Sequence, residues 1–358
     1  MSRGTRVTVH LNHLRQNLAV ARRLAPQCSV WAVVKANAYG HGLVRVAQLF
    51  APLSDGLAVA TLDEALKLRL AGLDTPILLM EGVVNAEQTQ QALTARLELV
   101  IHHREQIQWL AQAQVDQPVR VWLKIDTGMH RLGVSVNEVS GCLSQLEALP
   151  HIAKVGVMTH YACADDLDSA KTSTQYKAIS PWLTGRESSL ANSAAVLFWP
   201  EHQGTWVRPG IMLYGASPSA QRSARDLGLR HTMTLQAPII ALRDLQPGDS
   251  IGYGATYTAT EPMRLATLAM GYADGYPRHA PNGTPAAVRG ERIQVVGRIS
   301  MDMMTVDVSR VPQVQLQEFV ELWGGTVSVD EVAHAAGTIG YELMARLSIR
   351  GETNYEDA

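Results

Sequence analysis

The stretch Trp31-Ala32-Val33-Val34-Lys35-Ala36-Asn37-Ala38-Tyr39-Gly40-His41-Gly42 leads from an apolar segment into a lysine and then into a glycine-rich loop. The apolar part is typical of a buried strand, which would place Lys35 at the carboxyl end of that strand. Active sites of β/α barrels lie at such strand ends. A partly desolvated lysine there can lose its proton near neutral pH and form a Schiff base with a carbonyl cofactor. The alternative is a lysine whose stem covers apolar surface while its ammonium stays in water.

The sequence on either side repeats the pattern of a short apolar run followed by an amphipathic one. Eight runs are expected to be strands, at residues 30–34, 56–60, 76–80, 97–101, 119–125, 154–158, 188–191 and 206–213. The segment 63–70 illustrates the intervening helices, because its leucines recur at helical spacing, Thr61 and Glu64 fit a capping box, and Gly72 follows its end. This alternation favours a (β/α)8 TIM-type barrel. An open doubly wound sheet is the alternative, since the run at 188–191 and the helix after it have the weakest pattern.

The pattern changes after about residue 231 to extended segments separated by turn signals such as Gln246-Pro247-Gly248-Asp249, Pro281-Asn282-Gly283 and Arg289-Gly290-Glu291. Residues 295–297 and 304–308 are expected to be strands, and helical spacing returns only at 329–336 and 341–347. The sequence therefore predicts a barrel domain over residues 1–230, with about the first eight residues able to pair with the second domain. A mainly β domain follows over residues 231–358.

Composition narrows the class of function. The chain has 358 residues, of which 46% are hydrophobic and 18% charged, and a formal net charge of −2. No basic stripe indicates a nucleic-acid partner. The cysteines Cys28, Cys142 and Cys163 fit neither a fully paired disulfide framework nor a metal-binding spacing, so we expect no metal. Without a signal-peptide pattern or a run of about 18–20 apolar residues, the chain is expected to be cytoplasmic and not membrane-bound.

Seven collinear strings resemble the motifs of bacterial alanine racemases, which are enzymes of fold type III that use pyridoxal 5′-phosphate (PLP). They are VKANAYGHG (34–42), KIDTGMHRLG (124–133), VRPGI with the YG that follows it (207–215), GYGATY (252–257), GYADGYPR (271–278), GRISMD (297–302) and GYE (340–342). The resemblance spans nearly the whole chain. Ser300 and Gly252 depart from the residues that several relatives have, and neither position is assigned a proton transfer.

The resemblance implies a two-base racemisation of L- and D-alanine, in a homodimer with shared active sites. Lys35 would hold PLP as a Schiff base and act on one face of the substrate α-carbon, and Tyr253 of the partner subunit would act on the other. A phenol is a poor base near pH 7 unless a neighbour favours its anion, and His160 would provide that relay between Tyr253 and Arg208. Arg208 would face the pyridine nitrogen of PLP. A guanidinium only donates, so the nitrogen would stay unprotonated and the carbanion less delocalised.

The resemblance also implies the remaining contacts. The phosphate of PLP would be held by a group of hydroxyl and backbone N–H donors, with Asn192 beside them: Tyr39, Ser193, Gly210, Ile211 and Tyr341. The substrate carboxylate would meet Arg131 and the backbone of Met301, with Asp302 next to it. Lys124 is a possible carbamylated lysine that would steady Arg131. Tyr272 and Arg278 would line the entry channel. The D-alanine formed would serve peptidoglycan synthesis, or the enzyme would serve alanine catabolism.

Ordinary structural interpretations exist for each residue taken alone. Tyr253 could be a turn aromatic, His160 a barrel-rim histidine, Arg208 a structural arginine before Pro209, and Lys124 an interior lysine paired with a carboxylate. Three other functions also compete: a PLP decarboxylase of basic amino acids, a single-barrel PLP carrier, and a racemase with a broader pocket. The decarboxylases usually have a triple-glycine loop and a carboxylate facing the pyridine nitrogen, whereas this chain has Arg208 and no triple glycine. The second ends after the barrel, and the third is often secreted.

Overall fold

The computed structural model describes residues 4–357, and its contacts divide the chain into two compact units. One unit comprises Asn17–Leu213, and the other comprises Tyr214–Ala358 together with the described part of Met1–Gln16. The domain boundary expected at residue 230 stays a prediction.

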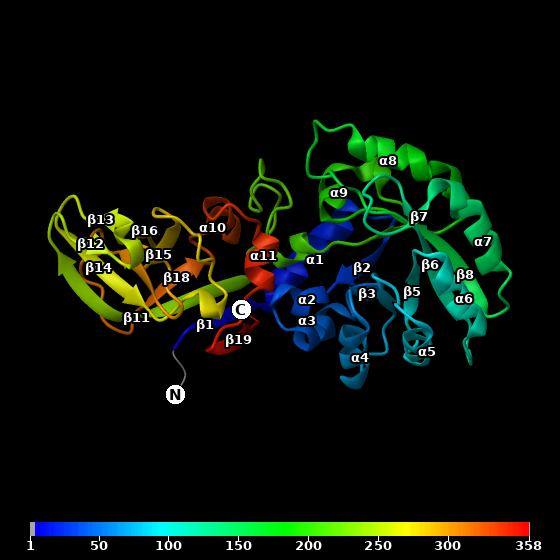
Figure 1. Cartoon of the computed structure of the whole chain (residues 1–358), viewed down its shortest axis with the longest axis horizontal. Helices are drawn as coiled ribbons and strands as arrows, with labels where there is room; N and C mark the ends of the chain where they lie inside the picture. The colour runs from blue at the N-terminus through cyan, green and yellow to red at the C-terminus, as the bar shows by residue number, and fades with distance from the viewer. Residues whose placement is uncertain (1–3, 358) are drawn as a thin grey trace. The chain divides into compact units, whose positions relative to one another are not determined.

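The unit Asn17–Leu213 is a closed barrel of parallel strands (Figure 1). Eight strands pair in a ring in which β10 joins β2 and β5 joins β6, and the short β7 (Val134–Ser135) extends β6. The ring strands are β2 (Ser29–Val33), β3 (Gly56–Val59), β4 (Ile77–Leu79), β5 (Glu98–Ile101), β6 (Val119–Asp126), β8 (Ile152–Met158), β9 (Ser188–Ser189) and β10 (Trp206–Val207). The closed ring confirms the predicted TIM-type barrel. It excludes the open sheet.

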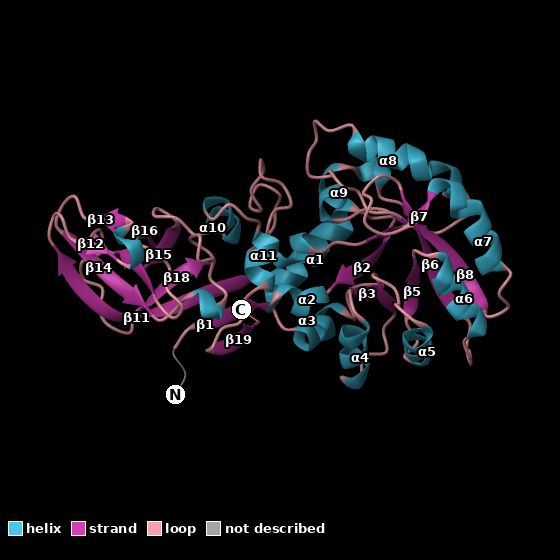
Figure 2. Ribbon diagram, viewed as in Figure 1, coloured by secondary structure: helices cyan, strands magenta, loops and turns pink. Residues whose placement is uncertain are grey.

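Helices follow the strands and surround them (Figure 2). They are α1 (Leu11–Leu24, in this unit from Asn17 onward), α2 (Lys35–Tyr39), α3 (Leu43–Phe50), α4 (Leu62–Leu70), α5 (Ala86–Thr94), α6 (Arg104–Gln112), α7 (Val139–Glu147), α8 (Lys171–Ile179) and α9 (Ser193–Phe198). The predicted capping box of α4 is present, with the Thr61 side chain accepting from the backbone of Glu64. Within residues 4–357, no helix has the length and apolar composition needed to cross a membrane.

The last two barrel strands are shorter than the sequence predicted. The run expected at 206–213 forms a strand only over Trp206–Val207, and Ile211–Tyr214 is a 3-10 helix. Pro209 has no N–H to donate to a ladder, and the N–H of Leu213 bonds to the carbonyl of Gly210 at 2.8 Å. The run expected at 188–191 likewise pairs only over Ser188–Ser189. The chain thus leaves the barrel early at these two positions, which frees residues 190–193 and 208–211 to line its mouth.

Three tryptophans fill part of the barrel interior. The rings of Trp31 and Trp206 stack with centroids 4.5 Å apart, and Trp122 lies edge-on to both at 6.4 and 6.0 Å. Gly56 makes room for them, because a Cβ there would lie 2.0 Å from the Trp31 ring. The absence of a side chain at Gly56 therefore lets the bulky tryptophans pack densely in the barrel interior.

Gly56→Ala is expected to destabilise the protein by about 1–3 kcal/mol, because the added methyl overpacks the tryptophan cluster. Urea unfolding would measure the change. Gly141→Ala is the matched control, since Gly141 lies on α7 with no atom near its potential Cβ. That change should raise stability by roughly 0.5–1 kcal/mol. Equal midpoints for the two variants would contradict the packing argument.

The second unit is a mainly antiparallel β structure, as predicted (Figure 1). Six strands close a ring in the order β14-β17-β16-β15-β18-β11, because the long β11 pairs with both β18 and β14. The elements of this unit are β1 (Arg6–His10), β11 (Met233–Leu245), β12 (Ser250–Ile251), β13 (Tyr257–Thr258), β14 (Met263–Leu268), β15 (Pro285–Val288), β16 (Glu291–Val295), β17 (Met304–Asp307), β18 (Phe319–Trp323), β19 (Glu352–Glu356), α10 (Val329–Ala335) and α11 (Gly340–Ala345). β1 adds to β11 antiparallel and to β19 parallel. The strand expected at 295–297 ends at Val295, since Gly297 has φ of 76°.

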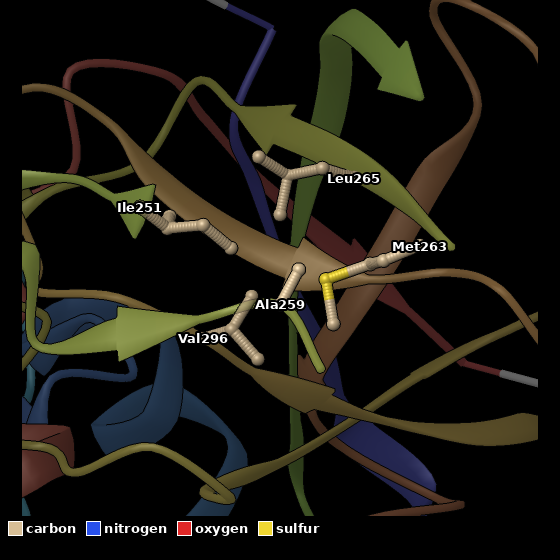
Figure 3. Packing of buried hydrophobic residues seen from close by; sticks show 5 residues of the cluster. All are labelled: Ile251, Ala259, Met263, Leu265 and Val296. Atoms are coloured by element: carbon tan, nitrogen blue, oxygen red, sulfur yellow. The ribbon is translucent and has the colours of Figure 1, made fainter. Parts of the chain in front are cut away.

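A small apolar core closes one part of this unit (Figure 3). Side chains from separate strands and loops pack together there: Ile251, Ala259, Met263, Leu265 and Val296. Because these residues come from the strand pair β12–β13, from β14 and from the segment after β16, the cluster secures the turn segment 252–256 between β12 and β13.

Three histidines also lie together in the β unit. The ring centroids of His10, His13 and His231 are 5.0–5.3 Å apart, and His13 Nδ1 donates to the His231 carbonyl at 2.6 Å. Burial, then the charges of His10, His13 and Arg230, lower the pKa of His231 to about 4. The histidine is therefore neutral in the folded protein at neutral pH.

Stability is expected to fall as the pH drops from about 6.5 to about 4. In this window the unfolded chain protonates His231 near its ordinary pKa of about 6.5, whereas the folded protein does not. His231→Asn should flatten this dependence, measured as urea midpoints at several pH values. The exposed His279→Asn serves as the control. A slope unchanged by His231→Asn would count against the cluster as its source.

Candidate active site

A left-handed turn begins at Ala36, directly after Lys35, at the carboxyl end of β2. The four residues that follow Lys35 have φ of 53°, 56°, 52° and 52°. Left-handed backbone costs about 1–2 kcal/mol for each non-glycine residue. The turn is held by the N–H of Ala38, which donates to the Val34 carbonyl at 2.8 Å, and by Asn37 Oδ1, which accepts from the N–H of Leu43 at 2.9 Å. Such strain persists only where the surroundings enforce it, and it is common at functional sites.

Four cationic side chains gather at the carboxyl ends of the barrel strands. Lys35 follows β2, Lys124 lies in β6, Arg131 follows β6 and Arg208 follows β10. Burial lowers the pKa of Lys35, Glu81 opposes this effect, and Arg131 reinforces it. Burial, followed by the charges of Arg208, Arg131 and Lys35, lowers the pKa of Lys124 to about 8. The barrel mouth therefore favours bound anions and neutral lysine amines.

Arg208 is buried and fixed by hydrogen bonds. Its Nη1 donates to the carbonyl and hydroxyl oxygens of Ser189, both at 2.6 Å, and its Nη2 donates to the Thr159 carbonyl at 2.7 Å. Nη2 also lies 3.4 Å from Nδ1 of His160. Because a guanidinium only donates, that nitrogen must accept, and the His160 proton is on Nε2. Burial, then the charges of Arg208 and Lys124, lower the pKa of His160 well below its ordinary value, which agrees with a neutral ring.

The loop that contains Arg131 is organised by Asp126. The Oδ1 atom of Asp126 accepts the backbone N–H groups of Gly128, Met129 and His130 at 2.9, 3.1 and 3.0 Å, and Oδ2 lies 3.0 Å from His130 Nδ1. Burial alone would raise the pKa of Asp126, but the hydrogen bonds from His130 and Gly128 lower it overall. An ionised carboxylate thus fixes the backbone immediately before Arg131.

Gln175 of α8 joins two loops of the barrel mouth. Its Nε2 donates to Thr127 Oγ1 at 3.1 Å and to the His160 carbonyl at 3.0 Å, and its Oε1 accepts the N–H of Ala162 at 2.9 Å. The side chain is fully buried. The Gln175 amide therefore connects the loop after β6 with the loop after β8, which contains His160.

The loops after β9 and β10 meet at Ser193. Its Oγ accepts the N–H groups of Gly210 and Met212 at 2.8 and 3.3 Å. A Cβ on Gly210 would lie 2.5 Å from the hydroxyl oxygen of Tyr39, so only glycine fits there. Burial raises the pKa of Tyr39, which stays a neutral phenol. The three predicted residues thus form one hydroxyl-lined corner.

Two further predicted residues flank this corner. Asn192 is the N-cap of α9, since its Oδ1 accepts the N–H of Ala195 at 3.0 Å. Ile211 is buried at the start of the 3-10 helix. The structure thus brings together ten of the residues singled out from the sequence, all in the barrel unit: Lys35, Tyr39, Lys124, Arg131, His160, Asn192, Ser193, Arg208, Gly210 and Ile211.

The other six predicted residues lie in the β unit, and several are exposed. Tyr253 is 70% exposed and Met301 54%. Tyr272 and Arg278 are exposed as well, whereas Tyr341, near the start of α11, is partly buried. Three of these exposed side chains, Tyr253, Met301 and Tyr272, are large and apolar.

Asp302, the sixth of these residues, is tied to the neighbouring loop by an arginine. Its Oδ1 lies 2.8 Å from Arg350 Nη2, and Arg350 also donates to both carboxylate oxygens of Asp274 at 2.7 and 3.0 Å. Asp274 is buried and accepts the N–H of Gly271 at 3.1 Å. Arg350 thus connects the segments 271–278 and 297–302.

Comparison with known proteins agrees with this geometry. Residues 9–218 match the family model described as alanine racemase, N-terminal domain, and residues 232–355 match the one described as alanine racemase, C-terminal domain. The chain belongs to the alanine racemase family. Members of this family are PLP-dependent isomerases.

Individual alanine racemases resemble the chain over nearly their full length. The alanine racemase of Halorhodospira halophila is 47% identical over 98% of this chain and 97% of its own, and that of Stutzerimonas stutzeri is 45% identical over 97% and 98%. The crystal structure of the biosynthetic alanine racemase from Pseudomonas aeruginosa matches with a TM-score of 0.95 at 45% identity, covering 98% of this chain and 99% of that one. The alanine racemase from Acinetobacter baumannii matches with a TM-score of 0.92 at 38% identity, covering 98% and 99%. The alternatives of a PLP carrier and a broader racemase are not favoured.

Sequence reasoning missed several residues that hold the alanine racemase motifs in place. Glu64, Asp126, Gln175 and Arg350 bond to backbone or side-chain groups of loops that contain predicted site residues. The predicted capping box identified Glu64, but nothing in the sequence indicated its hydrogen bond to the backbone N–H of Ala36. Asp126 lies within a recognised string, so its spacing from Arg131 was an available signal, whereas nothing in the sequence pairs Gln175 with His160.

Proposed function

We propose that this chain is an alanine racemase, which interconverts L- and D-alanine with PLP held on Lys35. Membership of the family over both domains is the single observation that supports this most strongly. The barrel mouth adds physical support, because it holds a lysine with a lowered pKa among cations that an anionic cofactor would neutralise. The role proposed is supply of D-alanine for peptidoglycan, in keeping with the biosynthetic alanine racemase among the relatives.

The residues present fit PLP. Gly210 lets the Tyr39 hydroxyl approach its backbone closely, since a Cβ there would lie 2.5 Å from that oxygen, and the Ser193 hydroxyl accepts the N–H of Gly210. These groups, with the backbone of Ile211 and the neighbouring Asn192, would hold the phosphate. The hydroxyl of Tyr341 would join them. When bound, PLP supplies an electron sink for the carbanion formed at the substrate α-carbon.

Arg208 would face the pyridine nitrogen of PLP. Its hydrogen bonds to Ser189 and Thr159 fix the guanidinium plane, so it presents a donor and leaves no proton on the nitrogen. Burial lowers the pKa of Arg208 to about 10, which still keeps the group charged at neutral pH. A weaker electron sink suits a reaction in which the proton must return quickly.

Proton transfer would use two bases on opposite faces of the α-carbon. Lys35 would act on one face, and Tyr253 of the partner subunit on the other. His160 has its Nε2 proton free to donate, because its Nδ1 accepts from Arg208. A donor beside the phenol oxygen would favour the phenolate and so make Tyr253 a usable base.

A homodimer is proposed on the exposed residues of the β unit. Tyr253 and Met301 are more than half exposed, and Tyr272, Met303 and Ile339 are exposed as well. A surface of this composition is typical of an interface. The partner would cover it and receive Tyr253 into its own barrel mouth.

Substrate binding is proposed for the residues around this entrance. Arg131 and the backbone of Met301 would take the alanine carboxylate, with Asp302 beside them, and Tyr272 with Arg278 would line the channel. Crowding by Tyr341 and Tyr253 would favour a methyl side chain. Discrimination against one added hydroxyl is inherently weak.

Lys124 is proposed as a carbamylated lysine. With its pKa lowered to about 8, a useful fraction of the amine is neutral and can attack CO2, which forms an N-carboxylate and releases one proton. The new anion would lie among the cations Arg131, Arg208 and Lys35. This anion would hold Arg131 in position. An unmodified interior lysine would instead need a carboxylate to neutralise its own charge.

The experiment that tests the function is α-proton exchange in D2O, followed by NMR with purified protein and PLP. Both L- and D-alanine should exchange their α-proton and yield the opposite enantiomer. Borohydride reduction followed by peptide mass analysis should find PLP on Lys35. Exchange without inversion would indicate a different PLP reaction, and a label on another lysine would reassign the cofactor site.

A further inference from the structure

Glu64 makes two sets of hydrogen bonds with its two carboxylate oxygens. Oε2 accepts the N–H groups of Ala60 and Thr61 at 3.0 and 3.3 Å, which caps the start of α4. Oε1 accepts the N–H of Ala36 at 2.6 Å. Ala36 is the residue directly after Lys35 and the first of the left-handed turn.

Only a carboxylate satisfies both sets. Three backbone N–H groups point at Glu64, so both of its oxygens must accept. A glutamine has one acceptor oxygen and one donor nitrogen, and the nitrogen would meet a donor on one side. An alanine would leave all three N–H groups without this partner, and an aspartate is one methylene shorter.

We propose that Glu64 is a positioning residue for Lys35, holding the first peptide of the left-handed turn and so fixing the direction in which the lysine side chain leaves β2. The inference rests on the proposed function of Lys35. The turn is strained over four residues, and the bond to Ala36 ties its beginning to the end of β3 and the start of α4. The segment after β2 and the segment between β3 and α4 therefore both fix the position of Lys35.

Glu64 also contributes to the charge balance around Lys35. The charged groups that face Lys35 are Glu81 after β4, Lys124 in β6, Arg131 after β6, Glu64 on α4 and Arg208 after β10. Burial lowers the pKa of Lys35, and both glutamates oppose that effect. Loss of the Glu64 charge would lower the pKa of Lys35 further, a change that a helix cap alone would not produce.

The test compares Glu64→Gln and Glu64→Ala with two matched controls in the full-length enzyme carrying PLP. Thr61→Ala removes the hydroxyl that accepts the Glu64 N–H at 3.3 Å, and so weakens the same helix cap without touching Ala36. Glu138→Ala removes the acidic residue of another capping box in the barrel, together with its ion pair to Arg104 at 3.0 Å. The readouts are the melting temperature, the rate at which hydroxylamine strips PLP from the protein, the kcat and KM for alanine, and the pH profile of kcat, which reports the ionisable groups of the substrate complex.

Both Glu64 variants should lose PLP to hydroxylamine faster and lose kcat, each on the order of tenfold or more, because misplacement by a fraction of an ångström is enough. KM should change little, and the acidic limb of the pH profile should move to lower pH. Thr61→Ala and Glu138→Ala should lower only the melting temperature. If Glu64→Ala does not fold, the near-isosteric Glu64→Gln decides.

The inference is overturned if the Glu64 variants match Thr61→Ala in PLP stripping, kcat and pH profile, since Glu64 would then be only a helix cap. Lys35→Ala, measured in parallel, separates this outcome from failure of the proposed function. PLP retained covalently by Lys35→Ala would refute the assignment of Lys35 itself. Wild-type behaviour of Glu64→Gln beside a Lys35→Ala that cannot hold PLP would refute the role of Glu64 alone.

Discussion

Lys35→Ala should lose both the visible absorbance of covalently held PLP and all measurable racemisation. Lys35 has the one amine side chain of the segment Lys35–Tyr39 that follows β2, and burial lowers its pKa so that the neutral form is available. Because the same amine is the proposed base on one face of the substrate, its removal deletes two functions at once. Catalysis by such a base alone is typically worth about 10²–10⁴-fold.

Absorbance spectra and alanine turnover of the purified variant measure this effect. Lys67→Ala is the control, since it removes an exposed lysine of α4 and should leave both readouts unchanged. Persistence of the visible band in Lys35→Ala would assign PLP to another lysine. Lys124 would be the next candidate, because it shares the barrel mouth and its pKa is lowered to about 8.

Tyr253→Phe should leave the fold intact and slow the abstraction of the α-proton from L-alanine more than from D-alanine. The side chain is 70% exposed, so removing its hydroxyl breaks no packing within the described chain. The loss in the affected direction should be about 10²–10⁴-fold, as expected for a general base. Racemisation overall must slow in both directions, so the asymmetry has to be sought in exchange with solvent deuterium.

The informative measurement is therefore solvent deuterium entering each enantiomer before inversion, with melting temperature as a check on folding. Tyr355→Phe is a matched control, since Tyr355 lies on β19 and is 37% exposed. Its kinetics should equal those of the unaltered enzyme. Equal slowing of exchange from L- and D-alanine by Tyr253→Phe would contradict a base that acts on one face.

Much of the fold follows from local patterns that the sequence displays. The eight barrel strands were each predicted within a few residues, except where Pro209 and Gly210 end β10 early. The capping box at Thr61 and Glu64 was predicted because both partners lie three residues apart. Closure of the ring between β2 and β10 follows from the strand count. The ring formed by β11 with both β18 and β14 could not be predicted, because it depends on long-range pairing.

The site residues likewise fall into those that local sequence predicts and those that depend on long-range contacts. The strings that resemble alanine racemases identified Lys35, Arg208 and the other residues with distinctive chemistry. The left-handed turn was not predicted, since alanine and asparagine give no signal strong enough to indicate φ near 50° in four successive residues. Gln175 and Arg350 were missed because their partners are distant in sequence and become neighbours only on folding.

Chiral chromatography of alanine after incubation with the purified protein and PLP tests the central claim most directly. Starting from either pure enantiomer, the account predicts approach to equal amounts of L- and D-alanine, the only equilibrium that mirror symmetry allows. If D-alanine fails to form from L-alanine while the protein holds PLP on Lys35, the assignment of alanine racemisation to this chain is wrong.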